Sequence, residues 1–429
     1  FVTADRPARL RLTGANQTTI QPGIFPLIKY LDTATSIPLS NQWSDGPFQL
    51  NIQFDTPLVD DYGVDWISQI NFSEVSETKE KEIPKDSIEI AGKAIVVVGH
   101  DKGNLSADQI NQFIKENNFP AISEDPFLNR ELIPHASLIL QDPKVREILK
   151  ADTVITIGRT TLSRSINEYI NLANHKIVID QKLESVDIKR SADLLLIDLP
   201  KIKNYNANQN FLELWKKASH LMGGVIESDK SWSESRAVKT IFENLAHEHE
   251  VFVGSSRTIR EVEGVIDYQK CSATFNSFAN RGLAGIDGNI STIFGIAQYS
   301  RKVLGVMGDV TFLHDLSSLL ATPANPTTLV VIDNNGGGIF NTLEQSNAPH
   351  FEEVFGTPHN RDLASLARGF GHKVIEVVDE ISLQQALNNQ EDFFKIIIIK
   401  VPNRNSLLQF LKDRSDYFCK EFLIGANLA

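Results

Sequence analysis

The chain is poor in cysteine, in long apolar runs and in net positive charge. Two cysteines in 429 residues cannot form a disulfide framework, which fits a reducing cytoplasm. No run of about 18 apolar residues occurs, which argues against a membrane span. Asp and Glu (54) outnumber Lys and Arg (42), giving a net charge of −12. Nucleic-acid binding needs a basic face, so we expect no nucleic-acid partner, although a locally basic pocket can still bind small anions.

The chain also lacks an initial methionine and a signal peptide. It opens on Phe1-Val2-Thr3-Ala4-Asp5, a pattern typical of the end of a buried strand. About 60 residues precede a charged segment, fewer than a usual domain of about 100–200. We therefore expect the sequence to begin inside a domain.

Short apolar strands alternate with helical patterns along the rest of the chain. This alternation predicts an α/β fold, with parallel sheets flanked by helices. The predicted division has four parts: a domain remnant at 1–62, a linker at 63–90, a central α/β domain at 91–203 and a final domain at 204–429. No Gly-x-Gly-x-x-Gly follows a strand of the central domain, so a spacer role is favoured there over nucleotide binding.

Hard oxygen ligands follow two predicted strands of the final domain. Gly308-Asp309 ends the strand 302–307, and Asn334-Asn335-Gly336 follows the strand 328–332. The Asp309 carboxylate, the Asn334 side chain and the Gly336 carbonyl suit an octahedral Mg²⁺ that also binds phosphate oxygens. The alternative is two ordinary turns. Together the two pieces predict a metal–pyrophosphate site of the kind found in thiamine diphosphate (ThDP) enzymes, with Gly336–Gly338 admitting backbone amides to the phosphates.

A glycine-rich segment, 280–288, precedes a predicted helix at 290–299. A helix start attracts anions, and Arg281 adds a bidentate donor for phosphate or carboxylate. Ile286 is a large apolar residue within this turn, and it is a candidate wedge beneath the cofactor ring. The alternative is a flexible surface loop.

Three further segments carry candidate binding residues. Ser256 and Arg260 lie four positions apart just past a strand, where an arginine suits a carboxylate; a solvated arginine is the alternative. The opening segment supplies further polar groups, and the segment after the metal motif is apolar, with core packing as the default interpretation. The polar candidates are Arg6, Asn16 and Gln17, and the apolar ones are Ile339, Phe340 and Leu343.

His314 and Asp315 are adjacent on a predicted helix, so they do not face each other as a catalytic dyad would. No Ser-His-Asp, Cys-x-x-Cys or His-Glu-x-x-His arrangement is present.

These motifs resemble the ThDP-dependent SEPHCHC synthase family of menaquinone biosynthesis, often called MenD. The resemblance covers nearly the whole chain and is most specific in Asn280–Gly288 and Gly308–Leu316. It implies a transferase with pyrimidine-binding, central and pyrophosphate-binding domains. The implied reaction is decarboxylation of 2-oxoglutarate on ThDP, followed by 1,4-addition of the succinyl carbanion to isochorismate. The implied metal is Mg²⁺, with Mn²⁺ as an alternative.

The resemblance also assigns residues. Metal ligands fall on Asp309, Asn334 and Gly336. ThDP contacts fall on Ser256, Arg281, Ile286, Gly308 and Ile339, with the metal ligands. Substrate contacts fall on Arg6, Asn16, Gln17, Arg164, Ser256, Arg260, Arg281, Ile339, Phe340 and Leu343.

Two departures from the family pattern concern charge and catalysis. A basic pair of the central domain is reduced here to Ser163-Arg164-Ser165. The glutamate that activates ThDP lies upstream of Phe1 in the family, so no catalytic residue is assigned within this stretch, and we expect the stretch alone to be inactive. The family places its sites between subunits, which implies a homodimer or homotetramer. The alternatives are another ThDP carboligase, of the acetolactate synthase kind, and a non-catalytic ThDP-binding protein.

Overall fold

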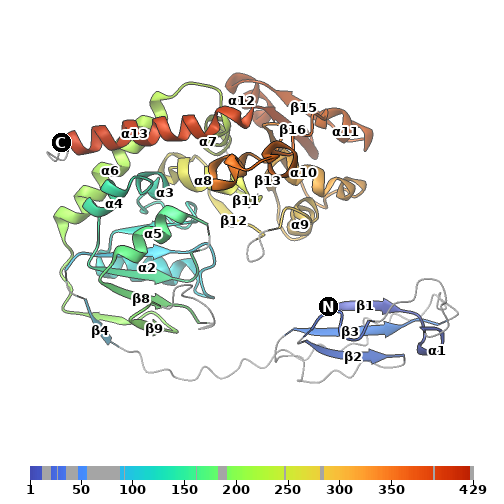
Figure 1. The fold of residues 1–429 in the computed structure, drawn as a ribbon, viewed down its shortest axis with the longest axis horizontal. Coiled ribbons are helices and arrows are strands. Elements are labelled where there is room, and N and C mark those ends of the chain that lie inside the picture. Colours follow the sequence, from blue (N-terminus) through green and yellow to red (C-terminus); the bar gives the residue numbers. More distant parts are fainter. Residues whose placement is uncertain are drawn as a thin grey trace. The chain divides into compact units, whose positions relative to one another are not determined.

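The computed structural model describes residues 1–11, 21–26, 28–34, 47–55, 87–90, 92–160, 162–181, 191–245, 248–280, 285–389 and 392–425. By its internal contacts the chain divides into two compact units, Phe1–Ile83 and Pro84–Ala429. Figure 1 shows the elements of each. Within the described ranges, no helix combines the length and the apolar character needed to cross a lipid bilayer.

The first unit holds a parallel sheet of three strands in the order β1-β3-β2. Its elements are β1 (Val2–Asp5), α1 (Ala8–Arg11), β2 (Lys29–Thr33) and β3 (Phe48–Gln53). The central strand carries a fully buried Asn51, whose amide donates to Asp5 at 3.2 Å and to Asp32 at 3.1 Å. A buried amide is tolerated because its hydrogen bonds are satisfied in this way. The strand predicted at the start of the sequence is present as β1, but the prediction that it is buried is wrong, since Val2 is 73% exposed.

The second unit contains a five-stranded parallel sheet in the order β6-β5-β7-β8-β9. Its strands are β5 (Ala94–Val98), β6 (Ala121–Ser123), β7 (Thr153–Ile157), β8 (His175–Ile179) and β9 (Leu194–Leu196), and its helices are α2 (Ala107–Asn117), α3 (Ala136–Ile139), α4 (Pro143–Ile148) and α5 (Arg164–Leu172). A separate ribbon pairs β4 (Ser87–Glu89) with β10 (Lys201–Lys203).

The strand order of this sheet changes direction between β5 and β7, where open α/β sheets usually bind ligands. Here the loops after these strands are joined by a bridge between Asp101 and Arg159. Gly158 has φ +69°, and a Cβ added there would lie 1.9 Å from the Asp101 carbonyl oxygen. Backbone therefore fills this crevice, which favours a structural role for the sheet.

A six-stranded parallel sheet in the order β12-β11-β13-β14-β16-β15 forms the other half of this unit. Its strands are β11 (His249–Val253), β12 (Phe275–Phe278), β13 (Val303–Gly308), β14 (Thr327–Asp333), β15 (Val374–Val377) and β16 (Phe394–Lys400). Residues 396–399 are four isoleucines with no exposed surface, since a central parallel strand is covered on both faces.

The helices of this half are α6 (Gln209–Ser228), α7 (Glu234–Asn244), α8 (Arg257–Val265), α9 (Asn289–Ile296), α10 (Asp309–His314), α11 (Leu363–Gly369), α12 (Glu380–Asn388) and α13 (Leu407–Gly425). Its shorter turns are η2 (Tyr268–Lys270), η3 (Leu316–Leu320), η4 (Gly338–Thr342), η5 (Glu344–Asn347), η6 (Glu352–Gly356) and η7 (Arg404–Ser406). Helices α9, α10 and α11 cover one face of the sheet, and α7, α8 and α12 cover the other (Figure 1). Among the α-helices, α13 packs mainly against α6, α4 and α3.

One hydrophobic core joins the two larger sheets. It runs from Ile95 of the five-stranded sheet to Leu304 and Ile397 of the six-stranded sheet. Trp215 on α6 is fully buried within it. This packing confirms the predicted fold class of parallel sheets flanked by helices. The division at residues 62, 90 and 203 remains a prediction.

Candidate functional site

Asp309 and Asn334 lie at the same edge of the six-stranded sheet. Strands β13 and β14 are parallel neighbours, with Gly308 paired to Ile332, so the residues that follow them emerge side by side. Both side chains are buried, with 2% and 6% of their surface exposed. The strand-end geometry inferred from the sequence is therefore present.

The Asp309 carboxylate is held by three donors. Its Oδ1 accepts the Val310 N–H at 2.7 Å, and its Oδ2 accepts the Gly336 N–H at 2.9 Å and His359 Nε2 at 3.1 Å. Burial raises the pKa of Asp309, and the nearby charge of Asp333 adds to the rise. A carboxylate offers about four acceptor positions, so one remains for a cation, which would also offset the cost of burying the charge.

Asn334 provides the strongest sign that this site suits a cation. Its Nδ2 donates to Glu234 Oε1, and its Oδ1 is buried with no hydrogen-bond partner among the described residues. An unpaired buried oxygen costs about 1–3 kcal/mol, so it needs an explanation. A hard oxygen beside Asp309 is what Mg²⁺ requires, and these residues fit that ion.

The turn that carries Gly336 can be built only with glycine. Gly336 has φ +134°, and a Cβ there would lie 2.3 Å from the Gly356 carbonyl oxygen. Its own carbonyl, the third predicted ligand, accepts the Gly338 N–H at 2.9 Å. A carbonyl oxygen has two lone pairs, so this bond leaves one for a metal.

His359 is a neighbour of this site that the sequence did not reveal. With Asp309 and Asp333 it forms a cluster whose potential ligand atoms lie within 4.8 Å of one another. However, His359 Nδ1 accepts the Arg361 N–H at 3.0 Å, so the ring proton sits on Nε2 and is donated to Asp309. A protonated Nε2 cannot bind a metal, and we assign His359 as a donor that orients Asp309.

A cavity of about 120 Å³ opens beside these residues. Several predicted residues line it, and Glu234, Arg257 and Thr258 were not predicted. The predicted lining residues are Ser256, Ile286, Gly308, Asp309, Asn334, Gly336 and Phe340. Ile339 and Leu343 are half-buried in and after η4, and they are not among the described lining residues.

Ser256 and Arg260 are brought together as their spacing predicted. Arg260 donates to the Ser256 carbonyl oxygen at 2.6 Å. Ser256 has φ +75°, an unusual conformation for a residue with a side chain, and it precedes the first residue of α8. The arginine thus supports a strained turn at the rim of the cavity.

The remaining predicted residues lie elsewhere or outside the described residues. Arg164 is exposed at the first position of α5, at the five-stranded sheet. Arg6 belongs to the first unit, where its backbone N–H donates to Asp5 at 2.8 Å. Asn16, Gln17 and Arg281 lie outside the described residues.

His314 and Asp315 form no dyad. Asp315 accepts the Ser291 N–H at 2.9 Å in the first turn of α9 and the Ser318 hydroxyl at 2.6 Å, whereas His314 is exposed. Asp315 therefore ties α9 to the turn after α10, and the prediction that the two side chains form no dyad is met.

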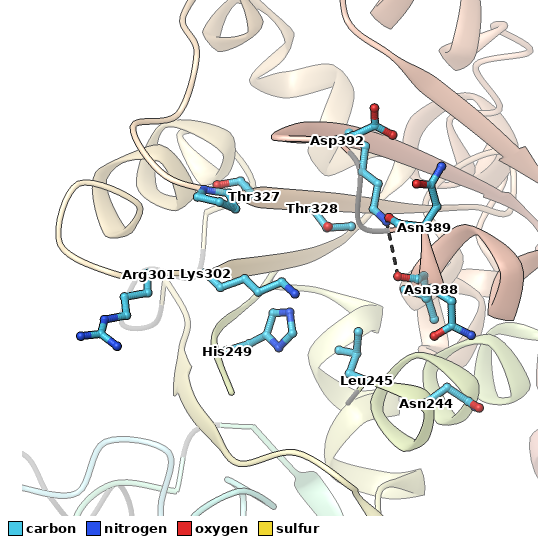
Figure 2. A pocket seen from close by; sticks show the side chains of 13 residues that line it. Asn244, Leu245, His249, Arg301, Lys302, Thr327, Thr328, Asn388, Asn389 and Asp392 are labelled. Carbon is cyan, nitrogen blue, oxygen red and sulfur yellow. Dashed lines mark hydrogen bonds between the residues drawn. The ribbon is translucent and has the colours of Figure 1, made fainter. Parts of the chain in front are cut away.

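A larger cavity of about 220 Å³ lies at the opposite edge of the six-stranded sheet, where the strands begin. Figure 2 shows His249, the first residue of β11, and Lys302, just before the neighbouring β13, on one side of it. Lys395 donates to the Ala386 carbonyl at 2.7 Å, near the end of α12, so this ammonium is already used as a helix cap. Ligands of open α/β sheets bind at the carboxyl ends of strands, which favours the cavity at Asp309.

Part of the second unit matches a known family of cofactor-binding domains. Residues 265–400 match the family described as "Thiamine pyrophosphate enzyme, C-terminal TPP binding domain". This segment includes Asp309, Asn334 and Gly336.

Curated relatives extend the similarity over most of the chain. Two are 2-succinyl-5-enolpyruvyl-6-hydroxy-3-cyclohexene-1-carboxylate synthases. The one from a Nocardioides species is 29% identical, covering 95% of this chain and 78% of the relative. The one from Lysinibacillus sphaericus is 26% identical, covering 88% and 74%. The resemblance that the motifs indicated is confirmed.

Among solved structures, benzoylformate decarboxylase from Polynucleobacter necessarius shares the fold. The TM-score is 0.57 at 15% identity, covering 94% of this chain and 82% of that one.

Proposed function

We propose that the chain is a ThDP-dependent transferase of menaquinone biosynthesis. The proposed reaction decarboxylates 2-oxoglutarate and adds the succinyl group to isochorismate, giving SEPHCHC and CO₂. The two relatives that carry this enzyme name match the chain over most of their own length. The observation that carries the proposal is the buried, unpaired Asn334 Oδ1 beside Asp309 at one sheet edge.

In this proposal Asp309, the Asn334 Oδ1 and the Gly336 carbonyl hold Mg²⁺, with Mn²⁺ as a substitute. When bound, ThDP supplies the electron sink for decarboxylation. The N–H groups of Gly337 and Gly338 already donate to the carbonyls of Gly356 and Gly336, so these glycines, which line the cavity, give the diphosphate space rather than hydrogen bonds. Ile286, half-buried at the cavity, supports the cofactor ring from one side.

Both proposed substrates are dicarboxylates, so they need cationic groups in an acidic protein. Arg260 and Arg281 are the proposed carboxylate partners in the second unit, since an arginine fork matches a carboxylate. Arg6, Asn16, Gln17 and Arg164 are proposed contacts contributed when subunits assemble. Ser256, Ile339, Phe340 and Leu343 are the proposed walls of the substrate pocket.

The proposed assembly is a homodimer or homotetramer with sites between subunits. The proposed location is the cytoplasm, which fits Cys271 and Cys419, both buried and unpaired.

The deciding experiment follows the loss of isochorismate absorbance, using protein expressed from the complete gene with Mg²⁺ and ThDP. We expect loss with 2-oxoglutarate and none with pyruvate. Loss with pyruvate alone would favour a carboligase of the acetolactate synthase kind. No loss with either acid, despite ThDP binding, would favour a non-catalytic protein.

The variant Asp309→Ala tests the metal assignment separately. We expect it to lose Mg²⁺-dependent ThDP binding in calorimetry while keeping its circular dichroism spectrum. Retained binding would refute Asp309 as a ligand.

A further inference from the structure

Glu234 stands beside the proposed metal site without being one of its ligands. It is the first residue of α7, where Ser233 caps the helix by accepting the Arg236 N–H at 3.2 Å. A carboxylate is favoured at this position by the helix dipole. Its side chain is 11% exposed and lines the cavity.

The two oxygens of Glu234 have different partners. Oε1 accepts from Asn334 Nδ2, and Oε2 lies 3.4 Å from Nε of Arg257. Arg257 is itself largely buried at the start of α8 and is also paired with Glu261. The ion pair keeps a negative charge next to the amide of Asn334.

This contact determines which way the Asn334 amide faces. The oxygen and nitrogen of an amide are nearly interchangeable in shape, so an asparagine can present either to a neighbour. An ionised carboxylate has no proton to donate, so the atom beside Glu234 must be the NH₂ group. The oxygen is then left on the other side, where it is buried and without a partner.

The space beside the Asn334 amide can be occupied only if residue 338 has no side chain. A Cβ on Gly338 would lie 2.9 Å from Asn334 Nδ2. Glycine at 338 therefore leaves room for the NH₂ group to turn toward Glu234.

We propose that Glu234 is a positioning residue: by accepting the Asn334 Nδ2 hydrogen it selects the amide orientation that aims Oδ1 at the metal. This inference rests on the proposed function, since it needs a cation between Asp309 and Asn334. It concerns a residue that the sequence motifs did not include.

The test measures Mn²⁺ affinity by electron paramagnetic resonance, with ThDP present, on protein expressed from the complete gene. Glu234→Ala should weaken Mn²⁺ binding by roughly 10–100-fold, as loss of an outer-shell partner does. Glu234→Gln should lose less than about tenfold, because its Oε1 can accept the same hydrogen bond. Arg236→Ala is the matched control, since Arg236 lies on the same helix α7 as Glu234 but pairs with Glu380 of α12 at 2.8 Å. It should leave Mn²⁺ affinity unchanged.

Repeating Glu234→Ala in an Asn334→Asp variant distinguishes a positioning role of Glu234 from a purely structural one. In Asn334→Asp an oxygen faces the metal in either orientation, so there is no amide orientation to select. Adding Glu234→Ala to that background should leave Mn²⁺ affinity equal or higher, because the new carboxylate at position 334 is no longer repelled by the carboxylate of Glu234. A structural role would instead give the same loss in both backgrounds, and that result overturns the proposal.

The remaining outcomes distinguish the two proposals. Tight Mn²⁺ binding by both the wild-type protein and Glu234→Ala would refute the positioning role of Glu234 and leave the proposed metal site standing. Absence of Mn²⁺ and ThDP binding by the wild-type protein refutes the metal site, and the positioning role with it. If Glu234→Ala fails to fold, Glu234→Leu, which also has no oxygen to accept the Asn334 hydrogen, gives the same comparison in the two backgrounds.

Discussion

The backbone N–H of Gly336 donates to Oδ2 of Asp309 at 2.9 Å, which ties the turn after β14 to the first residue after β13. The two elements that supply the proposed metal ligands are thus joined by a direct bond. The geometry of one ligand depends on the backbone that carries another.

Gly336→Ala should disrupt this link. The added Cβ would meet the Gly356 carbonyl oxygen at 2.3 Å, and φ +134° is unfavourable for alanine. We expect a loss of about 1–3 kcal/mol in the free energy of unfolding and at least a tenfold loss in ThDP affinity. Calorimetric titration with ThDP and Mg²⁺ measures the second effect.

Gly295→Ala is the matched control for that change. Gly295 lies within α9, and nothing lies within 4 Å of a Cβ added there. Helix propensity predicts a gain of up to about 1 kcal/mol with unchanged ThDP affinity. Equal ThDP affinity in both variants would contradict the role given to Gly336.

Arg260→Gln should weaken binding of the 2-oxo acid. Removing a charged hydrogen-bond donor costs about 1.5–3 kcal/mol, so KM for 2-oxoglutarate should rise roughly 10–100-fold. Steady-state kinetics with varied 2-oxoglutarate measures it. Arg368→Gln is the control, since Arg368 is an exposed arginine paired with Glu376. An unchanged KM in Arg260→Gln would rule out a substrate contact.

Arg130→Lys should lower stability without altering the site. Arg130 donates to the carbonyls of Tyr268, Cys271 and Ala273 at 3.0–3.2 Å. A lysine ammonium cannot reach all three in that geometry, and we expect a loss of about 1–3 kcal/mol. The midpoint of urea unfolding checks this. A fall in kcat with an unchanged midpoint would contradict it.

Glu263→Gln should stabilise the protein at alkaline pH. Burial raises the pKa of Glu263 to about 8, against hydrogen bonds from Ser137 that lower it, and the Glu124 charge adds to the rise. The folded state therefore holds a proton that the unfolded state releases above pH 4.5, its ordinary pKa. Stability falls as the pH rises from about 4.5 to about 8 and stays reduced above that range.

The variant carries no such proton, so it should equal the wild type near pH 4 and exceed it increasingly toward pH 8. One pKa unit corresponds to about 1.4 kcal/mol, so the gain should reach about 2 kcal/mol or more. Urea unfolding at pH 5 and pH 8.5 measures it, with the exposed Glu131→Gln as control. A difference independent of pH would refute the raised pKa.

The sequence predicts the proposed metal ligands well, because Asp309 and Asn334 each follow a strand whose apolar run is unmistakable. Parallel strands deliver their carboxyl ends to one edge, so no tertiary information was needed. Short strands with exposed residues, such as β12 and β15, carry no comparable run and were missed.

Glu234 and His359 could not be found in that way. Glu234 looks like an ordinary acidic residue in a first helical turn, and His359 lies in a segment without periodicity. Each reaches the site through packing between elements distant in sequence, 100 positions apart for Glu234 and Asn334 and 50 for His359 and Asp309. Only the folded chain reveals such partners.

The turn after β14, which carries Asn334 and Gly336, is packed against side chains from β16 and from the residues that follow β16. Lys400, at the end of β16, pairs with Asp333, and Arg404 Nε lies 3.0 Å from the place of a Cβ on Gly336. During synthesis, β13 and β14 leave the ribosome before β16 exists to insert beside β14. A nascent chain that has not reached Arg404 therefore carries both proposed ligands on turns that still lack these two side chains.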